Sequence, residues 1–373
     1  MRSQRRLITS ADSSGGVRGS SPFGQHSRHQ GLISVVIPVY GVRAYLTECL
    51  DSVLGQESGP GLEVIAVDDA STDGSGALLD ERARADSRLR VVHLDHSGGP
   101  GNARNVGLGK ATGEYVWFVD GDDALATGAI DAVRTRLAAV RPDVLLIDYL
   151  DWFPDGTLGA STGVELLGSA PAGEFTLADA PRLINLTMTG WSKLFRREFL
   201  VELGEPFRTG IHEDIPVTCA ALLAGRLGAL DRPCYRYRRS RPGSFMVTTS
   251  SKHREVFNAY EEVFDLLAKH ISAADPVATS RVQAAIFERA IWHYASVLAT
   301  PGLVPKAERR RFFERMHADY VRYEPDHYAL PSGARGAKFR LIKRNSYVTY
   351  ELLEPVNRVR VGLRRYLHIA HPK

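Results

Sequence analysis

Between residues 32 and 150 the chain alternates short apolar runs with segments whose apolar residues recur at helical spacing, and this alternation restricts the fold more than any other feature. The apolar runs are read as strands and are LISVVIPVY (32–40), LEVIAVDDAS (62–71), LRVVHLD (89–95), EYVWFVD (114–120) and DVLLIDYL (143–150). The helical segments between the first four runs cover residues 42–56, 76–85 and 99–112. Near-continuous apolar strands joined by helices predict an α/β fold, with a mostly parallel sheet covered by helices on both faces.

The alternation does not extend over the whole chain, which is expected to divide into four parts. Residues 1–30 carry five Arg and one acid among many Ser and Gly, which predicts a disordered basic N-terminal tail. The α/β domain is expected over residues 31–250, and renewed helical spacing predicts a helical C-terminal region over 251–334. Residues 335–373 carry ten Lys and Arg against two Glu. This basic segment is expected either to pack on the rest of the protein or to meet anionic lipid at a membrane surface.

The composition is that of a soluble globular protein. Of the 373 residues 44% are hydrophobic and 24% are charged. No run reaches the roughly 18 apolar residues that a membrane span needs, and the N-terminus lacks the apolar core of a secretory signal. The three cysteines, Cys49, Cys219 and Cys234, lack metal-site spacing and are expected to be reduced and buried. These features predict a cytoplasmic protein, and a net charge of +4 gives no indication of nucleic-acid binding.

Polar residues follow several predicted strands at the point where each strand ends. Ligands of parallel sheets bind beyond the carboxyl ends of the strands, so these residues should face one crevice. An Asp at such a position is suited to accept hydrogen bonds from a ribose or a base. The alternative is an Asx turn that caps the next helix, and this interpretation accounts well for Asp73. The strand-end residues are Tyr40, Asp68, Asp69, Asp120, Asp122 and Asp123.

The sequence DGDD (120–123) is the most informative of these strand ends. Carboxylates this close repel one another unless positive charge lies among them. An Asp-Gly-Asp sequence lets two carboxylates turn toward one point, and oxygen ligands favour Mg²⁺ or Mn²⁺ bridging to substrate phosphates. The alternative is a solvated turn with Asp123 in the first turn of a helix. Because the motif follows an apolar strand, it predicts a metal site at Asp122 and Asp120.

Five blocks, in this order along the chain, resemble bacterial family 2 glycosyltransferases with a GT-A (Rossmann-like) fold. The resemblance covers roughly residues 32–245 and implies a nucleotide-sugar donor, with a UDP-sugar expected, and an Mg²⁺ or Mn²⁺ ion. Gly41 departs from the pattern, because relatives usually carry Asn after the Tyr. The blocks are SVVIPVYGVRAYLTECLDSVLGQ, EVIAVDDASTDGS, GGPGNARNVGLGKATGEYVWFVDGDD, WSKLFRREFL and HEDIPVT.

The resemblance also implies roles for individual residues. Asp69 is expected to contact the base or ribose with Asp68 beside it, Asp122 to bind the metal, and Asp120 to approach both the ribose and the metal. For Arg104 the alternative to a position near the nucleotide is a surface ion pair. Glycines at 98, 99 and 101 would let backbone approach the donor. The other residues expected around the nucleotide are Pro38, Val39, Tyr40 and Gly121. The arginine-rich sequence CYRYRRSRPGSF (234–245) is expected, from its residues, to be either a strand with alternating exposed arginines or a loop that closes over the donor diphosphate. In the second case the residues that would meet the diphosphate oxygens are Arg236, Arg238, Arg241 or Ser244.

Glycosyl transfer requires a group that takes a proton from the acceptor hydroxyl. The resemblance implies that IHEDIPVT (211–218) supplies it, with Asp214 as the base and Glu213 as the alternate, and that the anomeric carbon is inverted. From the residues alone, the favoured role of Asp214 is to cap the helix that follows, with Pro216 in its first turn, and only the resemblance favours the base. Lys193 is expected either to reach the acceptor or a phosphate, or to be exposed to solvent. Trp191 is expected to be a sugar platform or a core residue.

The acceptor expected for such an enzyme is a polysaccharide, a wall polymer or a lipid-linked glycan. Two other functions share some of these features. A nucleotidyltransferase would use the same sheet and acid-bound metal, but it needs basic residues in the first loop, where PVYGVRAYL offers only Arg43. A non-catalytic nucleotide- or carbohydrate-binding module would not need the acids at 69, 120, 122 and 214. The sequence therefore favours an enzyme of the glycosyltransferase class.

Overall fold

The computed structural model describes residues 29–56, 61–159, 163–240, 248–270 and 275–353. Within these ranges nine strands form one sheet, in the order β3-β2-β1-β4-β8-β6-β9-β5 with β7 beside β6. Residues 1–28 of the predicted basic N-terminal tail and residues 354–373 of the basic C-terminal segment lie outside the described residues, and residues 29–30 belong to the first strand. The strands are β1 His29–Val39, β2 Leu62–Asp68, β3 Leu89–His93, β4 Gly113–Phe118, β5 Ala124–Leu125, β6 Val144–Trp152, β7 Leu158–Gly159, β8 Lys193–Arg196 and β9 Leu227–Arg238.

The first half of the sheet has the predicted parallel arrangement. Strand β1 pairs in parallel with β2 and β4, and β2 pairs in parallel with β3. The crossovers are the helices α1 Arg43–Leu54, α2 Ser75–Ala85 and α3 Gly99–Lys110. The predicted fold class, an α/β sheet with helices on both faces, is confirmed.

The second half is mixed, because the four-residue strand β8 enters antiparallel between β4 and β6. Two antiparallel pairings in succession leave β6 parallel to β4, and β9 then pairs in parallel with β6. Sequence WSKLFRREFL carries β8, but a strand this short has no periodicity of its own to reveal it. The arginine-rich segment begins as part of β9 and continues into residues 241–247, which are outside the described residues.

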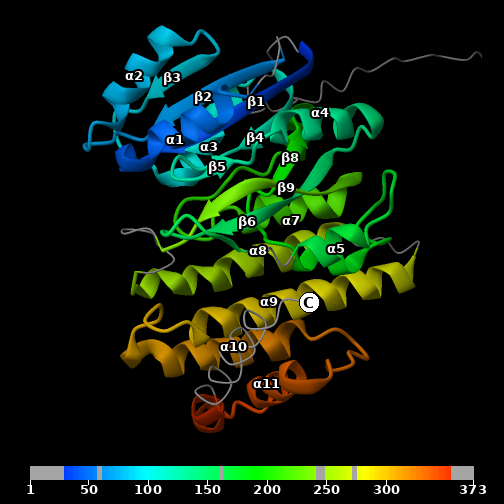
Figure 1. Ribbon diagram of the computed structural model, residues 1–373. Helices are drawn as coiled ribbons and strands as arrows, with labels where there is room; N and C mark the ends of the chain where they lie inside the picture. The colour runs from blue at the N-terminus through cyan, green and yellow to red at the C-terminus, as the bar shows by residue number, and fades with distance from the viewer. Residues whose placement is uncertain (1–28, 57–60, 160–162, 241–247, 271–274, 354–373) are drawn as a thin grey trace, which may run out of the picture.

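Alternation along the strands divides the interior into two cores. Val36 of β1 and Phe118 of β4 face one core, whereas Val35 of β1 and Trp117 of β4 face the other. The second core is covered by α1 and by α4 Ala129–Ala139. The first core is covered by α3 and by the C-terminal helices, which follow one another in layers away from the sheet (Figure 1). These helices are α7 Ile215–Ala224, α8 Glu255–His270, α9 Pro276–Ala299, α10 Arg309–Tyr323 and α11 Gly333–Lys343.

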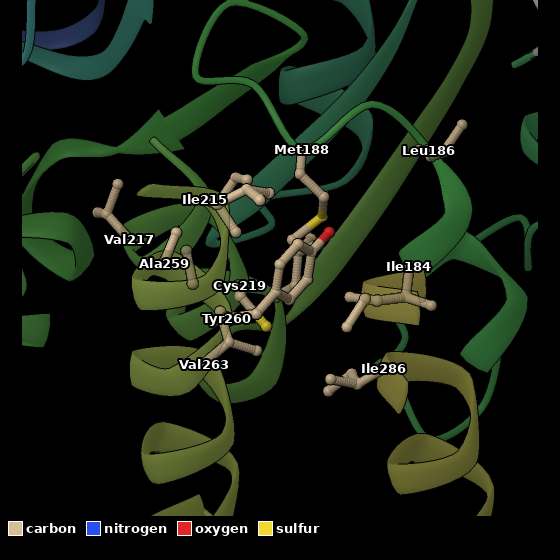
Figure 2. Packing of buried hydrophobic residues seen from close by; sticks show 14 of the residues in the cluster. Ile184, Leu186, Met188, Ile215, Val217, Cys219, Ala259, Tyr260, Val263 and Ile286 are labelled. Carbon is tan, nitrogen blue, oxygen red and sulfur yellow. The ribbon is translucent and has the colours of Figure 1, made fainter. Parts of the chain in front are cut away.

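The helices predicted at 254–271 and 280–299 are therefore present as α8 and α9, and they share a core with the sheet. Figure 2 shows side chains from α7, α8 and α9 gathered around Tyr260, together with Ile184 of the short helix η1 (Pro181–Asn185). Short helices α5 Val164–Gly168 and α6 Arg197–Leu203 complete this side of the domain. None of the described helices is both long and apolar enough to cross a bilayer.

This shared core predicts that the helices and the sheet unfold together. Ile286 of α9 is buried in the cluster of Figure 2, so Ile286→Ala should lower the free energy of unfolding by about 2–5 kcal/mol. Val277 near the start of α9 is 62% exposed, and Val277→Ala should change it by less than about 0.5 kcal/mol. Urea unfolding followed by tryptophan fluorescence and far-ultraviolet circular dichroism checks this. Two separate transitions in Ile286→Ala would contradict the single cooperative unit.

Candidate active site

The strands β1, β2, β4 and β9 end at one edge of the sheet. Val39 at the end of β1 pairs with Asp68 at the end of β2, and Val36 pairs with Phe118 at the end of β4. Arg238 at the end of β9 donates its backbone N–H to Asp123, just past β4, over 2.7 Å. The strand-end residues that the sequence singled out are therefore brought to a common edge, as expected for a parallel sheet.

The first acid pair organises the loops around it. The buried Asp69 carboxylate accepts hydrogen bonds from Ser97 Oγ (2.6 Å), Gly98 N (2.8 Å) and Gly99 N (2.9 Å), at the start of α3. Asp68 accepts from Ser71 N over 3.0 Å and lies 2.9 Å from His93 Nδ1. Both carboxylates thus have protein partners on at least one side, and the contact of Asp69 with a base or ribose stays a prediction.

Asp73 has the structural role that the sequence allowed for it. Its carboxylate accepts from Ser75 N (3.0 Å) and Ser75 Oγ (2.7 Å) at the start of α2, and from Arg43 N (2.9 Å) at the start of α1. These bonds use N–H groups that the first turn of a helix leaves without an internal partner. The Asx-turn interpretation is confirmed.

The residues expected to line the base pocket lie at the end of β1, beside the DGDD turn. Pro38 and Val39 are buried at the end of β1, whereas Tyr40 is 58% exposed. A Cβ atom added to Gly121 would lie 3.1 Å from the carbonyl oxygen of Pro38, so the DGDD turn packs closely on the β1 end. Ser244, also expected near the nucleotide, lies outside the described residues.

The three carboxylates of DGDD differ in their surroundings. Asp123 is buried and accepts hydrogen bonds from Tyr235 Oη and Arg238 N, both over 2.7 Å. Burial, reinforced by the charges of Asp122 and Asp120, raises the pKa of Asp123 well above its ordinary value. Asp120 and Asp122 are partly exposed. Asp123 therefore holds the turn in place.

Arg238 supports the same turn from β9. Its Nε donates to the carbonyl oxygen of Asp122 and its Nη2 to Glu48, both over 2.7 Å. The guanidinium lies over the rings of Trp152, at 3.8 Å from the centroid, and of Tyr45, at 4.9 Å. Among the candidate diphosphate-binding arginines, Arg238 is thus engaged in holding the acidic turn.

A buried ion-pair bridge connects DGDD to the predicted base motif. Arg104 of α3 is 4% exposed, and it donates from Nη2 to Asp120 over 2.7 Å and from Nη1 to Glu213. Burial alone would lower the pKa of Arg104, but the charges of Asp120, Glu213 and Asp214 raise it above its ordinary value. The interpretation of Arg104 as part of a surface ion pair is therefore wrong.

Asp214 lies next to this bridge and is partly exposed. It occupies the residue before α7, but its Oδ2 accepts from Gly190 N over 3.1 Å instead of capping that helix. Burial raises the pKa of Asp214 to about 7, the charge of Glu213 adds to this, and Arg104 opposes it. A carboxyl group with a pKa close to the working pH is suited to general base catalysis. Glu213, by contrast, is tied to Arg104.

Two other predictions are corrected by the structure. Lys193 is buried, not solvent-exposed, and donates to Thr187 O (2.7 Å), Thr189 O (3.2 Å) and Ser192 Oγ (2.8 Å). Burial lowers the pKa of Lys193 to about 7, and the charge of Asp214 opposes this. Gly101 was expected to let backbone approach the donor. A Cβ atom at Gly101 would overlap the carbonyl oxygen of Arg208, so the missing side chain instead leaves room for the protein's own backbone.

The aromatic residues around Trp191 form part of the core. Trp191 is 4% exposed and stacks on Tyr235 with ring centroids 4.5 Å apart, so of its two predicted roles the structure supports the core one. Sequence reasoning missed Tyr235, whose Oη also accepts a hydrogen bond from Asp120 N over 3.1 Å. The alternation of Tyr and Arg in β9 was the only available indication, because Tyr235 and Asp120 are far apart in the chain. All three cysteines are free and buried, as predicted.

No group of three or more His, Cys, Asp or Glu side chains among the described residues is arranged to hold a metal ion by itself. The predicted metal ligands, Asp120 and Asp122, are two carboxylates with oxygen donors only. Such a pair suits Mg²⁺ or Mn²⁺, which commonly take their remaining ligands from water and substrate phosphates. The residues present therefore fit a cation that is completed by its substrate.

Comparison with known proteins gives consistent matches. The family model described as Glycosyl transferase family 2 matches residues 34–204. Glycosyltransferase GlyG of Streptococcus pneumoniae is 38% identical over 121 residues, which are 32% of this chain and 40% of that protein. Poly(ribitol-phosphate) beta-N-acetylglucosaminyltransferase TarS of Staphylococcus aureus is 32% identical over 247 residues, which are 65% of this chain and 41% of TarS. The chain thus spans about two fifths of these relatives' lengths.

A solved structure shows the same fold. Residues 1–349 of S. aureus TarS, in complex with UDP-GlcNAc, superpose with a TM-score of 0.71 and 24% identity, over 88% of this chain and 91% of that one. The superposition extends beyond the sheet into the C-terminal helices, because it covers most of both chains.

The Arg104 bridge predicts a large loss of stability when its charge is removed. Arg104→Met would leave Asp120 and the buried Glu213 unpaired, and the free energy of unfolding should fall by about 3–5 kcal/mol. Arg310→Met, which removes an exposed pair with Glu314, should cost less than about 1 kcal/mol. Urea unfolding checks both. The double variant Arg104→Met/Glu213→Gln should recover part of the loss, and a single-variant loss below about 1 kcal/mol would contradict the bridge.

Proposed function

Residues 34–204 of this chain are a glycosyl transferase family 2 domain, and on that premise we propose that the protein transfers a sugar from a UDP-sugar to a hydroxyl of a polysaccharide, wall-polymer or lipid-linked acceptor. One observation carries the proposal. Arg104 joins the turn expected to hold the donor diphosphate, through Asp120, to the loop expected to hold the base, through Glu213. Asp214 stands beside that bridge at the same edge of the sheet.

The donor site is proposed at the ends of β1, β2 and β4. Tyr40 is exposed there beside Pro38, Val39 and Gly121, and it offers a ring on which a base can stack. Asp68 and Asp69 fix the neighbouring loop. Asp120 is proposed to approach the ribose. The choice of a UDP-sugar is supported by the TarS structure, whose ligand is UDP-GlcNAc.

Asp122 and Asp120 are proposed as ligands of Mg²⁺ or Mn²⁺ at this site. When bound, such an ion neutralises the charge that develops on the departing diphosphate. The chain's own contribution is to hold the two carboxylates at the rim. Arg238 donates to the Asp122 carbonyl oxygen, and Arg104 donates to the Asp120 carboxylate. The buried Asp123 anchors the DGDD turn to Tyr235.

Asp214 is proposed as the base. It takes the proton of the acceptor hydroxyl while that oxygen attacks the anomeric carbon, and the bond from this carbon to the diphosphate oxygen breaks in the same displacement. The attack comes from the face opposite the leaving group, so the configuration inverts. Burial and, after it, the charge of Glu213 raise the pKa of Asp214, and the Gly190 N–H orients the carboxylate.

The proposal includes a cytoplasmic location, with contact to anionic lipid at the inner face of the membrane through the basic segment 335–373. Phe339 and Ile342 of α11 are buried against the other helices, while Arg340, Lys343 and Arg344 are exposed. Val348 and Leu352 are exposed close to these charges, at 67% and 70%. Exposed apolar side chains beside basic ones are the combination that favours an anionic lipid surface.

The base assignment predicts a loss of transfer without a loss of donor binding. Asp214→Asn should lower kcat by about 10²- to 10⁴-fold, because Asn cannot accept the proton. In the unmodified protein kcat should rise with pH through about 7, as Asp214 ionises. Both are measured by UDP release from UDP-GlcNAc in the presence of a wall-polymer acceptor, with UDP affinity measured separately by calorimetry. Normal turnover in Asp214→Asn would show that another group is the base.

The metal assignment predicts a change in cation-assisted binding. UDP with MnCl₂ should raise the melting temperature of the unmodified protein, since a ligand at a hundred times its Kd stabilises by about 2.7 kcal/mol. In Asp122→Asn the part of this shift that depends on Mn²⁺ should disappear, whereas Asp131→Asn on the exposed face of α4 should behave like the unmodified protein. A full Mn²⁺-dependent shift in Asp122→Asn would disprove its role as a ligand.

A further inference from the structure

The loop from Phe207 to Asp214 carries both acids of the proposed base motif and lies outside the segment 34–204 that matches the family model. Helix α3 holds one side of this loop. Asn105 brackets Phe207 with two hydrogen bonds, from Nδ2 to Phe207 O (2.9 Å) and from Phe207 N to Oδ1 (3.0 Å). Arg104, next to Asn105, holds Glu213. The position of the loop relative to the acidic turn is therefore set by α3.

Helix α8 holds the other side of the loop, through Glu255 at its first position. Glu255 Oε2 accepts a hydrogen bond from Ile211 N over 2.9 Å. Gly210 has a φ of +99°, and a Cβ atom added there would overlap the same carboxylate. The carboxylate of Glu255 thus occupies the space in which any other residue at 210 would place its side chain. Two turns further along α8, Glu262 accepts a hydrogen bond from Arg208 Nε over 2.7 Å.

The backbone of the loop is strained two residues before Asp214. His212 has a φ of +66°, a conformation that non-glycine residues adopt at a cost and keep only when their surroundings enforce it. Its ring lies between His253 and His293, with centroids 6.4 Å and 5.2 Å away. These two histidines come from the short helix before α8 and from α9. The C-terminal helices therefore enclose the strained residue.

We propose that Glu255 is a positioning residue for the transfer reaction, through which helix α8 holds the loop that places Asp214. The proposal rests on the proposed function, because it takes Asp214 to be the base. It makes the C-terminal helices part of the catalytic unit, although they share no segment with the matched family domain. Loss of the Glu255 carboxylate frees the Ile211 N–H and removes the support from Gly210, so the loop can leave the conformation that aims Asp214 at the acceptor.

Glu261 provides a matched control on the same helix. It also makes two ion pairs, with Arg315 (3.2 Å) and Arg322 (2.9 Å), but both partners belong to α10 and neither contacts the loop. Glu261→Ala and Glu255→Ala therefore remove comparable interactions of α8, and only the second is directed at the loop. A further variant, Glu255→Gln, keeps an oxygen that can accept from Ile211 N.

Two measurements on the full-length protein test the proposal. In Glu255→Ala, amide hydrogen exchange in peptides covering 208–214 should be at least tenfold faster than in the unmodified protein, and kcat for UDP-GlcNAc turnover should fall at least tenfold with the donor KM unchanged. Glu261→Ala should leave both unchanged, and Glu255→Gln should keep most of the protection and of the turnover.

The outcomes separate this inference from the proposed function. Unchanged exchange of the loop in Glu255→Ala overturns the inference, and so does faster exchange with an unchanged kcat. Equal effects of Glu255→Ala and Glu261→Ala on the loop overturn it as well, because they would show general loosening of α8. If the unmodified protein turns over no nucleotide sugar with any acceptor, the proposed function fails, while the exchange experiment still decides whether Glu255 holds the loop.

Discussion

The buried guanidinium of Arg104 is the interaction on which the rest of the site depends. It pairs with Asp120, just past β4, and with Glu213, which lies 109 residues after Arg104 in the chain. A buried charge is tolerated only when it is paired, and breaking such a pair leaves uncompensated charge on both sides. The acidic turn and the loop that carries the proposed base are consequently held at a fixed separation. This is a requirement of any reaction in which one group must activate an acceptor while another region holds the leaving group.

The acidic turn shows how the chain manages its own repulsion. The sequence suggested that three neighbouring carboxylates need a cation among them. One of the three, Asp123, does not need a cation, because it is buried, accepts two protein hydrogen bonds and has its pKa raised. Arg104 provides positive charge for the second, Asp120. Protein partners thus already relieve part of the repulsion within the turn. The Mg²⁺ or Mn²⁺ ion is proposed because it would neutralise the donor diphosphate.

The C-terminal helices have a second function besides enlarging the core. Helix α8 packs with α7 and α9 around Tyr260 (Figure 2). Its Glu255 and Glu262 also accept hydrogen bonds from the loop before Asp214. The same layer therefore contributes both to folding and to the geometry of the proposed base. Lys193 acts comparably, since its buried amino group donates hydrogen bonds to the carbonyl groups of Thr187 and Thr189, in the loop whose Gly190 N–H is donated to Asp214.

Much of the fold was readable in the sequence, because strand and helix periodicities are local and the carboxyl ends of parallel strands share one edge. That reasoning placed Asp68, Asp69 and Asp120 at a common rim, and the resemblance added Asp214. The sequence could not assign partners. Contacts between distant segments decide whether Arg104 lies on the surface or between two acids, and whether Lys193 is exposed. They also decide which of Glu213 and Asp214 pairs with Arg104. Only the tertiary structure determines these, because burial and pairing set the charge and orientation of each side chain, and neither is a property of local sequence.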